Sequence, residues 1–534
     1  MIDTKALREK ILDLAIRGKL VPQDSNDEPT SVLLERIRAQ KQQMVKEGKL
    51  KAKDIKNDTI IFKGEDNLHY EQFQDGTVKC IEDEIPFEVP EGWAWTRLCS
   101  VSYDLPYGTS KKSSTNGKIA VLRMGNLQNG EIDYSDLVYS SDEEDIKKYY
   151  LIRGDLLFNR TNSIELVGKT SVYRGDIPAI YAGYLIRIRS SLNYEYLNAV
   201  MNSSYAREYC TSVRTDAVNQ SNINATKLGH FLIAIPSKSE QKRIGEKISE
   251  SIKVINIIEQ EKLDLQTMAT NVKSKILDLA IRGKLVPQDP NDEPASVLLE
   301  RIRSEKEELI KQGKIKRDKK ESVIFKGEDN SYYRIVGKSS EECEDLPFDL
   351  PQGWQWTNLG QYSEKVTDQV ASGSFASLRA NVVSLKEPDY AIMIKTADFS
   401  NKFTKNLTYT DKHGYEFLEN SNLFGGELIL SNIGSIGKVF RVPDLKTKMT
   451  LAPNSVMVRL TNDEYRDYLY YFLQSPTGYE ELKAISTGVA MLKFNKTDLK
   501  TICLPVPPLA EQKRIVETIE TIFTQLDEIT NSIA

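Results

Sequence analysis

The stretch KILDLAIRGKLVPQDSNDEPTSVLLERIR at residues 10–38 returns at residues 275–303 as KILDLAIRGKLVPQDPNDEPASVLLERIR, with only two of 29 positions changed. Three shorter segments also occur twice, in the same order: IFKGEDN at 61–67 and 324–330, IPFEVPEGWAWTRL and LPFDLPQGWQWTNL at 85–98 and 346–359, and FLIAIPSKSEQKRI and ICLPVPPLAEQKRI at 231–244 and 502–515. Between these segments the two copies diverge heavily. The chain is therefore an internal duplication, and the duplication decides its architecture.

The two copies are cut differently. Residues 240 to about 326 form one continuous block, whereas its second copy is split between the two ends of the chain. The part beginning EQKRI closes the chain at 511–534, and the part beginning KILDLAIRGKL opens it at 10–63. Joining the ends would restore the block. The repeat order is therefore cyclic, which predicts that the two termini lie close together.

The connecting blocks carry apolar residues at alternating spacings of four and three, the pattern of a coiled-coil seam. Residues 240–283 would form a helix of about 66 Å, and Gly18 and Gly283 should end the helices. We expect the long helices to pair antiparallel within the chain; a helical bundle without a special role is the plainer alternative. The predicted seam consists of Ile244, Ile248, Ile255, Ile258, Leu265, Val272, Ile276, Leu279, Ile515, Ile519, Ile522, Leu526, Ile529, Leu7, Ile11 and Leu14.

A second amphipathic helix is expected after each glycine, at 31–47 and 296–312. The preceding Asn26-Asp27-Glu28-Pro29 has the composition of a helix start, with acid in the first turn. The apolar positions of these helices need a partner, either the long helices or another subunit.

The two divergent segments open with GWAW and GWQW, which hold all four tryptophans, and we expect these to anchor the domain core. Strand–turn–strand patterns follow at 119–133 and 154–173, and again at 391–405 and 426–442. One helix is expected at 194–209 and another at 463–474, each before a final strand. The segments are therefore predicted to be α+β domains.

Composition excludes several classes of protein. Lys and Arg number 72 against 77 Asp and Glu, which argues against a general polycation. Five cysteines without a CxxC pair and three scattered histidines indicate neither a disulfide framework nor a metal site. The charged N-terminus does not resemble a signal peptide, and no apolar run is long enough to span a membrane. A reduced, cytoplasmic protein is the expectation.

Catalytic signatures are also missing: we find no methyltransferase N/D-P-P-Y/F motif and no GxGxxG that opens a helix. SIELVGKT at 163–170 is close to a phosphate-binding loop, but Ser163 replaces the first glycine and a strand is expected to follow. An enzyme that uses a nucleotide there remains one alternative. A coiled-coil scaffold that presents two divergent modules to other proteins is the other.

The order of divergent domain, EQKRI helix, divergent domain, EQKRI helix resembles the specificity subunit of type I restriction–modification systems. The GW-x-W openings, the G-x-x-GK turns, the EQKRI exits and the KILDLAIRGKLVPQD block all match, over essentially the whole chain. The resemblance implies a non-catalytic DNA-binding subunit whose two target recognition domains each read one half of a bipartite asymmetric site. It further implies double-stranded DNA, two methyltransferase subunits and restriction/translocase subunits as partners, with S-adenosylmethionine, ATP and Mg on those partners.

The expected fold is thus α+β: two α/β target recognition domains separated by two long antiparallel coiled-coil helical conserved regions, pseudo-two-fold and cyclic in repeat order. The predicted segments are an N-terminal helical segment (1–63), a first recognition domain (85–236), a central helical region (237–330), a second recognition domain (346–507) and a C-terminal helix (508–534). The long helices would set a short unread gap between two half-sites. Because charge is nearly balanced in each domain, the subunit alone should bind DNA weakly.

Candidate DNA contacts are polar residues of the predicted turns. Arg can bridge guanine O6 and N7, Asn can bridge adenine N6 and N7, and Lys more often holds phosphate. For any single one the alternative is a solvated charge or a turn-forming asparagine. Arg123 and Lys395 align, which favours a framework or phosphate role, whereas Arg160 aligns with Asn432, as suits discrimination. The candidates are Lys111, Lys112, Arg123, Asn126, Arg160, Asn162, Lys169, Arg379, Asn381, Lys395, Asn432, Ser435, Lys438 and Lys493.

Overall fold

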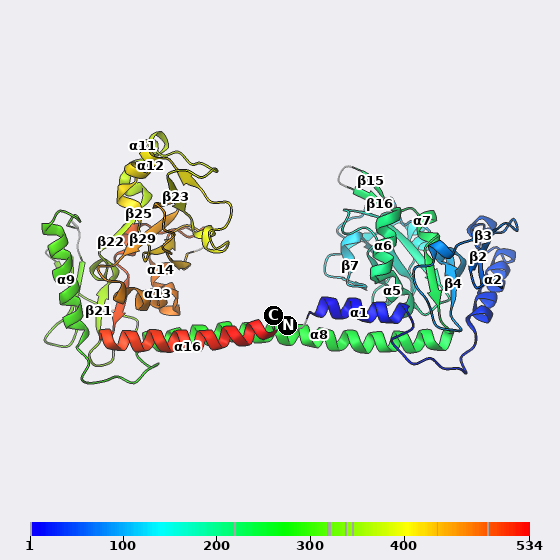
Figure 1. Ribbon diagram of the computed structural model, residues 1–534, viewed down its shortest axis with the longest axis horizontal. Helices are drawn as coiled ribbons and strands as arrows, with labels where there is room; N and C mark the ends of the chain where they lie inside the picture. Colours follow the sequence, from blue (N-terminus) through cyan, green and yellow to red (C-terminus); the bar gives the residue numbers. More distant parts are fainter. Residues whose placement is uncertain are drawn as a thin grey trace. The chain divides into compact units, whose positions relative to one another are not determined.

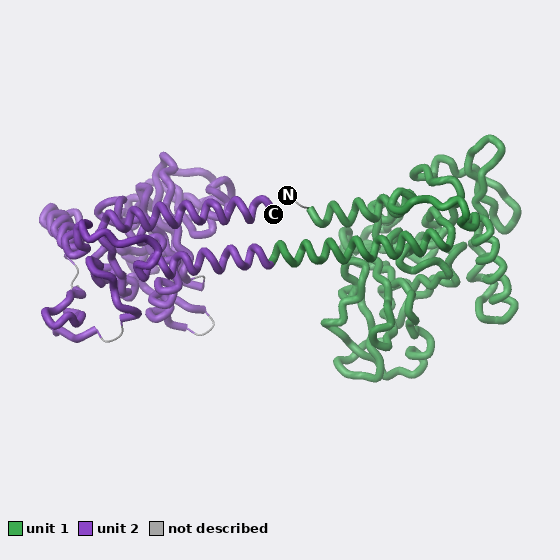
Figure 2. The backbone as a smooth tube through the Cα atoms, turned by 90° about the horizontal axis from the view of Figure 1, so that it is seen from below, with its two compact units in different colours: residues 1–263 green, residues 264–534 purple. Residues whose placement is uncertain are grey.

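The structure, a computed structural model, describes residues 3–217, 220–317, 322–336, 339–343, 346–434, 436–488 and 491–533. The chain forms two compact units, residues 1–263 and 264–534 (Figure 2). The division falls inside α8 (Lys238–Ile281), one unbroken helix of 44 residues. Among the described residues, none of the helices combines the length and apolar character that a membrane span requires.

In the first unit, α1 (Thr4–Ile16) lies alongside the first part of α8 (Figure 1). Arg8 at its start pairs with Glu259 at 2.9 Å, whereas Gln23 beyond its end donates to Glu240 at 2.6 Å. Residue numbers rise along α1 as their partners' numbers fall along α8. The two helices are therefore antiparallel, as predicted.

The second unit repeats this pairing with α16 (Leu509–Ile533) against the last part of α8. Lys273 donates to Asp527 at 2.5 Å and Gln288 to Glu511 at 3.3 Å, which again fixes an antiparallel direction. Gly18 and Gly283 follow the helix ends with φ of 67° and 65°. A Cβ at either glycine would lie 2.4 Å from a proline Cγ, so glycine is required for packing as well as for backbone geometry.

The predicted seam is buried only in part. Ile244, Ile248 and Ile255 are buried in the first unit, and Ile515 and Ile519 in the second. Ile258, Leu265, Ile276, Leu279, Ile522, Leu526, Ile11 and Leu14 are only half-buried. The prediction is wrong for Leu7, Val272 and Ile529, which are exposed. Ile244, Ile248, Ile515 and Ile519 join cores that contain residues of the neighbouring domain, such as Tyr196 and Tyr468. These four are therefore buried where a third element packs on the helix pair.

The second amphipathic helices are α2 (Thr30–Lys46) and α9 (Ala295–Lys311). Leu33 and Ile37 of α2 enter the core of the first unit, and Leu298 and Ile302 of α9 enter that of the second. These four positions therefore pack within their own unit. Val32 and Val297 are 41% and 44% exposed, and docking of another subunit on these helices stays a prediction. Each helix is followed by a small antiparallel sheet, whose strands are β1 (Ile60–Lys63), β2 (His69–Gln72) and β3 (Val78–Cys80), and β18 (Ser322–Lys326), β19 (Tyr332–Val336) and β20 (Ser339–Glu342).

Each divergent domain starts and ends on one strand pair. β4 (Ala94–Arg97) pairs with β17 (Leu232–Ile235), and β21 (Gln355–Asn358) pairs with β30 (Cys503–Val506), both antiparallel. The helix predicted at 194–209 is two helices, α5 (Tyr194–Asn202) and α6 (Ser204–Val213), because Ser203 caps the second. Their counterparts are α13 (Arg466–Gln474) and α14 (Pro476–Ala484), with Ser475 as the cap.

The two domains share one sheet topology despite their divergence. The order β12-β10-β14-β5 in the first matches β27-β26-β29-β22 in the second. A further sheet in each, of three strands in the first domain and four in the second, contains one parallel pair, β6 with β13 or β23 with β28. Both are α+β, as predicted. The strands are β5 (Ser102–Asp104), β6 (Ile119–Leu122), β9 (Val138–Ser140), β10 (Leu156–Asn159), β12 (Thr170–Val172), β13 (Ala179–Tyr181) and β14 (Leu185–Ser190), and β22 (Lys365–Asp368), β23 (Ala391–Ile394), β24 (Tyr409–Thr410), β25 (Asn422–Leu423), β26 (Leu428–Ser431), β27 (Val439–Arg441), β28 (Met449–Leu451) and β29 (Ser455–Arg459).

Candidate nucleic-acid interface

The EQKRI repeat forms the same joint in both units. Glu240 accepts a hydrogen bond from Trp93 Nε1 at 3.0 Å and one from Gln23. In the second unit, Glu511 accepts from Trp354 Nε1 at 3.0 Å and from Gln288. The glutamate of EQKRI, the first tryptophan of GWxW and the glutamine of VPQD thus meet at one point. The repeated residues hold each divergent domain to its long helix.

The arginine of EQKRI makes the second contact of this joint. Arg243 pairs with Asp27 at 2.7 Å, and Arg514 pairs with Asp292 at 2.6 Å. The prediction that Asp27 lies in the first turn of a helix is wrong, since α2 begins after Pro29. An acidic residue shortly before a proline suggests a helix start in the sequence. Asp27 instead binds Arg243, which is more than 200 residues away in the chain.

Burial raises the pKa of Glu240, although hydrogen bonds from Gln23 and Trp93 act in the opposite direction. The folded state therefore binds this proton more tightly than the unfolded state. Its stabilising effect is fully present below the ordinary glutamate pKa and is lost as pH rises through the raised value. We expect the difference in unfolding free energy between Glu240→Gln and wild type to change across that window, because glutamine stays neutral.

Chemical denaturation of the full chain at a series of pH values, followed by hydrogen exchange in the first unit, measures this difference. Glu246→Gln, a change on the exposed side of the same helix, serves as the control and should parallel wild type. Parallel pH profiles for Glu240→Gln and wild type would contradict the assignment.

Several DNA-contact candidates gather where a turn adjoins a hairpin. In the first unit, the turn after β10 enters β11 (Thr161–Asn162), which pairs with β16 (Gln220–Asn222). β16 in turn pairs with β15 (Thr215–Ala217), whose residues are all exposed. We call residues 160–169 with 215–217 and 220–222 the first turn–hairpin edge. Arg160, Asn162 and Lys169 all belong to it.

The second unit has a matching edge. Ile433 bridges to Lys493, Gly434 N donates to Leu492 O at 2.9 Å, and Asn432 Nδ2 donates to Phe494 O at 3.2 Å. The second turn–hairpin edge comprises residues 432–434 and 436–438 with 486–488 and 491–494. It brings together three candidates, Asn432, Lys438 and Lys493, the two lysines being exposed. Ser435 lies outside the described residues.

Arg160 lies in an aromatic setting that the sequence did not reveal. Its guanidinium carbon is 4.5 Å from the centre of the Tyr107 ring, and its backbone N–H donates to Tyr184 O. Tyr107 and Tyr184 are both exposed. Arg160 Nη1 also donates to Gly183 O at 3.4 Å, and its Nε is buried. The exposed tyrosines can stack or donate hydrogen bonds. No short motif marks these tyrosines, because they come from segments far apart in the sequence.

Other DNA-contact candidates form hydrogen bonds or ion pairs that stabilise their own turns. Asn126 is 3% exposed; it accepts from Arg123 N and donates to Asp133 O and Asp136 O, so the DNA-contact prediction is wrong for it. Arg123 pairs with exposed Asp136 at 2.8 Å. Lys395 N is held by Asp398 in the same way that Arg123 N is held by Asn126, which supports the framework role suggested by their alignment.

The remaining candidates lie outside the two edges. Lys111 pairs with Asp142 at 2.7 Å, which raises the pKa of the lysine. Asn381 bonds to Ser377 O and to His413 Nε2, at 2.9 and 3.0 Å. Lys112 and Arg379 are exposed. Sequence reasoning missed the hairpin residues 215–217 and 220–222, although their polar run is visible in the sequence.

The near-match to a phosphate-binding loop, residues 163–170, does not have the required geometry. Thr170 starts β12, so a strand and not a helix follows the turn. The helix N-terminus that would hold a phosphate is therefore missing from this segment.

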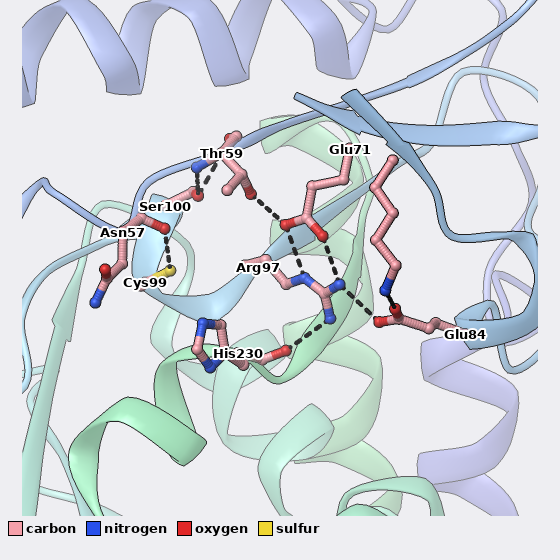
Figure 3. Close-up of polar contacts among 9 residues, drawn as sticks. Asn57, Thr59, Glu71, Glu84, Arg97, Cys99, Ser100 and His230 are labelled. Atoms are coloured by element: carbon pink, nitrogen blue, oxygen red, sulfur yellow. Dashed lines mark hydrogen bonds and ion pairs between the residues drawn. The ribbon is translucent and has the colours of Figure 1, made fainter. Parts of the chain in front are cut away.

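A buried charge network joins the small sheet of the first unit to its recognition domain (Figure 3). Arg97 of β4 donates to both carboxylate oxygens of Glu71 on β2, at 3.0 and 2.7 Å, and to Glu84 at 2.7 Å. Its third nitrogen donates to His230 O at 2.9 Å. Burial by itself would lower the pKa of Arg97, but the two carboxylates outweigh it and raise the pKa. This network fixes the orientation of the domain's first strand.

Two copies of one α+β domain, each with a polar edge of its own residues, have the organisation of a protein that recognises two different targets. The family model described as "Type I restriction modification DNA specificity domain" matches residues 106–267 and 376–534, more than half of the chain. The chain belongs to this family and is a type I restriction–modification specificity subunit.

The curated relatives span nearly the whole chain. This chain is 26% identical over 592 residues to the type I restriction enzyme EcoEI specificity subunit of Escherichia coli, and the match covers 98% of this chain and 90% of the relative. The EcoAI specificity subunit of Escherichia coli is 27% identical over 583 residues, with the same coverages. A solved chain from a study titled as the complex assembly and conformational transition of the type I R-M system matches with TM-score 0.51 and 16% identity, covering 84% of this chain and 94% of that one; it supports the fold alone.

Proposed function

We propose that the chain selects the DNA sequence modified by a type I restriction–modification complex, with each recognition domain reading one half of a bipartite asymmetric site. The observation that carries this proposal is the pair of turn–hairpin edges. They stand at the same place on the same sheet topology but present different residues, Arg160 and Asn162 in one and Lys493 in the other, where Asn432 is held in the turn by its hydrogen bond to Phe494 O and has its Oδ1 buried. Like frames with unlike edges suit two different half-sites.

The partners of the proposed complex are double-stranded DNA, two methyltransferase subunits and restriction/translocase subunits. S-adenosylmethionine, ATP and Mg would act on those subunits, and this chain would be non-catalytic. Exposed apolar side chains on one side of α8 support docking of a partner there. They are Val254, Ile257 and Met268, which are 56%, 57% and 61% exposed.

Exchange of one domain tests the proposal. Residues 99–230 are replaced by the corresponding segment of a relative, and the chain is expressed with its methyltransferase partner. We expect one half of the methylated sequence to change while the other half and the gap stay the same, because only one edge has been altered. Methylome sequencing gives the result.

A matched exchange of residues 360–500 should change only the other half. If neither exchange alters the methylated sequence, the chain does not read DNA, and the scaffold alternative would account for its two modules.

A further inference from the structure

A basic pocket of about 500 Å³ opens on the second recognition domain, beside β24. Three of its lining residues are lysines and none is acidic. Hydroxyl and amide groups complete the polar lining. The lining residues are Lys386, Pro388, Lys395, Thr404, Lys405, Asn406, Leu407, Thr408 and Tyr409.

The wall of the pocket is held in a fixed shape. Lys395 Nζ donates to Thr408 Oγ1 at 2.8 Å and to Asn406 O at 3.3 Å. Asn406 has φ of 59°, a left-handed conformation that a residue other than glycine adopts at a cost. The hydrogen bonds from Lys395 therefore hold the two sides of the loop that carries Lys405.

Three phenylalanine rings pack together and anchor the same loop. Lys402 and Phe403 also have positive φ, 53° and 58°. The Phe403 ring lies 5.0 Å from Phe399, which stacks on Phe440 of β27 at 4.3 Å. Such backbone strain persists only where surrounding contacts enforce it. The pocket is thus a built feature of the domain.

The positive charge of the pocket is offset only in part. Within the part of the chain that the structure describes, neither Lys386 nor Lys405 forms an ion pair. Lys395 Nζ forms an ion pair with Asp398 Oδ1 at 3.8 Å, while Asp398 Oδ2 accepts from Lys395 N. In the first unit the corresponding cation, Arg123, is paired with Asp136. Both matching places thus hold a paired cation, and among the described residues the second domain adds Lys386 and Lys405 without ion pairs.

We propose that this pocket binds a phosphate group of the DNA backbone, which gives the second recognition domain a grip that does not depend on base sequence. Lys, Thr, Asn and Tyr side chains, all present in this lining, are among the groups that hold backbone phosphates. This inference rests on the proposed function, because it takes the ligand to be DNA. A free phosphate ion shares the chemistry, and the experiment separates the two sources.

The test uses the full chain, assembled with its methyltransferase partner, carrying Lys386→Gln together with Lys405→Gln. Lys395 is left intact because it holds the loop. Removing one lysine–phosphate interaction should make the plot of log affinity against log salt less steep by about 0.9. The affinity for specific DNA and the affinity for unrelated DNA should fall equally, because the two substitutions do not alter base recognition. The control is Lys412→Gln on α12 (Lys412–Phe417), where the lysine pairs with Glu416 at 3.7 Å.

A second arm identifies the source of the phosphate. A duplex carries one neutral methylphosphonate linkage, which is placed in turn at each position along the second half-site. At one position the linkage should weaken DNA binding by wild type, and it should not change DNA binding by the double variant. If no linkage matters but inorganic phosphate at constant ionic strength competes only with wild type, the pocket takes a free anion and the backbone assignment is overturned.

The two proposals fail differently. If the wild-type complex shows no sequence preference, the proposed function is wrong. If wild type reads its site but the double variant keeps the salt slope of Lys412→Gln, only the pocket proposal is overturned.

Discussion

Replacing Glu71 by Arg should lower the unfolding free energy of the first unit by about 3–5 kcal/mol, the range seen when one partner of a buried ion pair is removed. Glu71 is 3% exposed and Arg97 is 8% exposed, so neither charge can turn to water. The substitution would place two guanidinium groups against each other at the joint between β2 and β4. Hydrogen exchange of the β2 and β4 segments under denaturant measures the destabilisation within the full chain.

Glu28→Arg is the matched control, because it reverses charge in the exposed pair that Glu28 forms with Arg36 at 2.6 Å. Exposed pairs contribute at most about 1 kcal/mol. Adding Arg97→Asn to Glu71→Arg should recover part of the stability by removing the repulsion. Equal effects of Glu71→Arg and Glu28→Arg would show that the joint is not held by this pair.

In the second unit, the contact between the small sheet and the recognition domain is made by residues with different charges. At the positions that match Glu71 and Arg97 in the repeats stand Arg334 and Asn358. Arg334 donates to Cys503 Sγ at 3.3 Å, and Asn358 Nδ2 donates to Ser322 O at 2.6 Å. A first-type recognition domain moved to the second position would therefore bring Arg97 beside Arg334. Recombination through the repeated blocks should yield stable proteins only when the small sheet and the domain stay matched.

Inserting one helical heptad into α8 between residues 263 and 264 should abolish methylation at the original site. Seven residues add about 10.5 Å, or about three base pairs at 3.4 Å each. They also turn the helix by about 20° less than two full turns, so the apolar faces on both sides keep their direction. We expect methylation to move to sites whose two halves are unchanged and whose gap is about three base pairs longer.

Methylome sequencing reads both the half-sites and the gap. A seven-residue Gly/Ser insertion at the same point is the control, because it adds length without stiffness and should leave no single preferred gap. Methylation at the original spacing after the helical insertion would exclude α8 as the element that sets the gap.

Sequence alone located most of the frame, because its signals are local. The duplication is visible as repeated sequence, and the alternating spacing of four and three residues predicts the long helices. Gly18 and Gly283 follow the ends of α1 and α8 with the positive φ that favours glycine. Strand patterns were enough to assign the α+β class. The alignment of Arg123 with Lys395 predicted an equivalent role in both domains, and the same backbone hydrogen bond holds each of them.

The tertiary structure decided which polar and apolar residues are used for packing. Asn126 looked like a base-reading asparagine, but main-chain groups of its own turn occupy its side chain. Asp27 binds Arg243, and Leu7 stays exposed although it fits the seam. These outcomes depend on contacts between segments distant in the chain, and a local pattern carries no information about which distant surface will cover it. The identity of each residue fixed its chemistry, whereas the fold chose its neighbour.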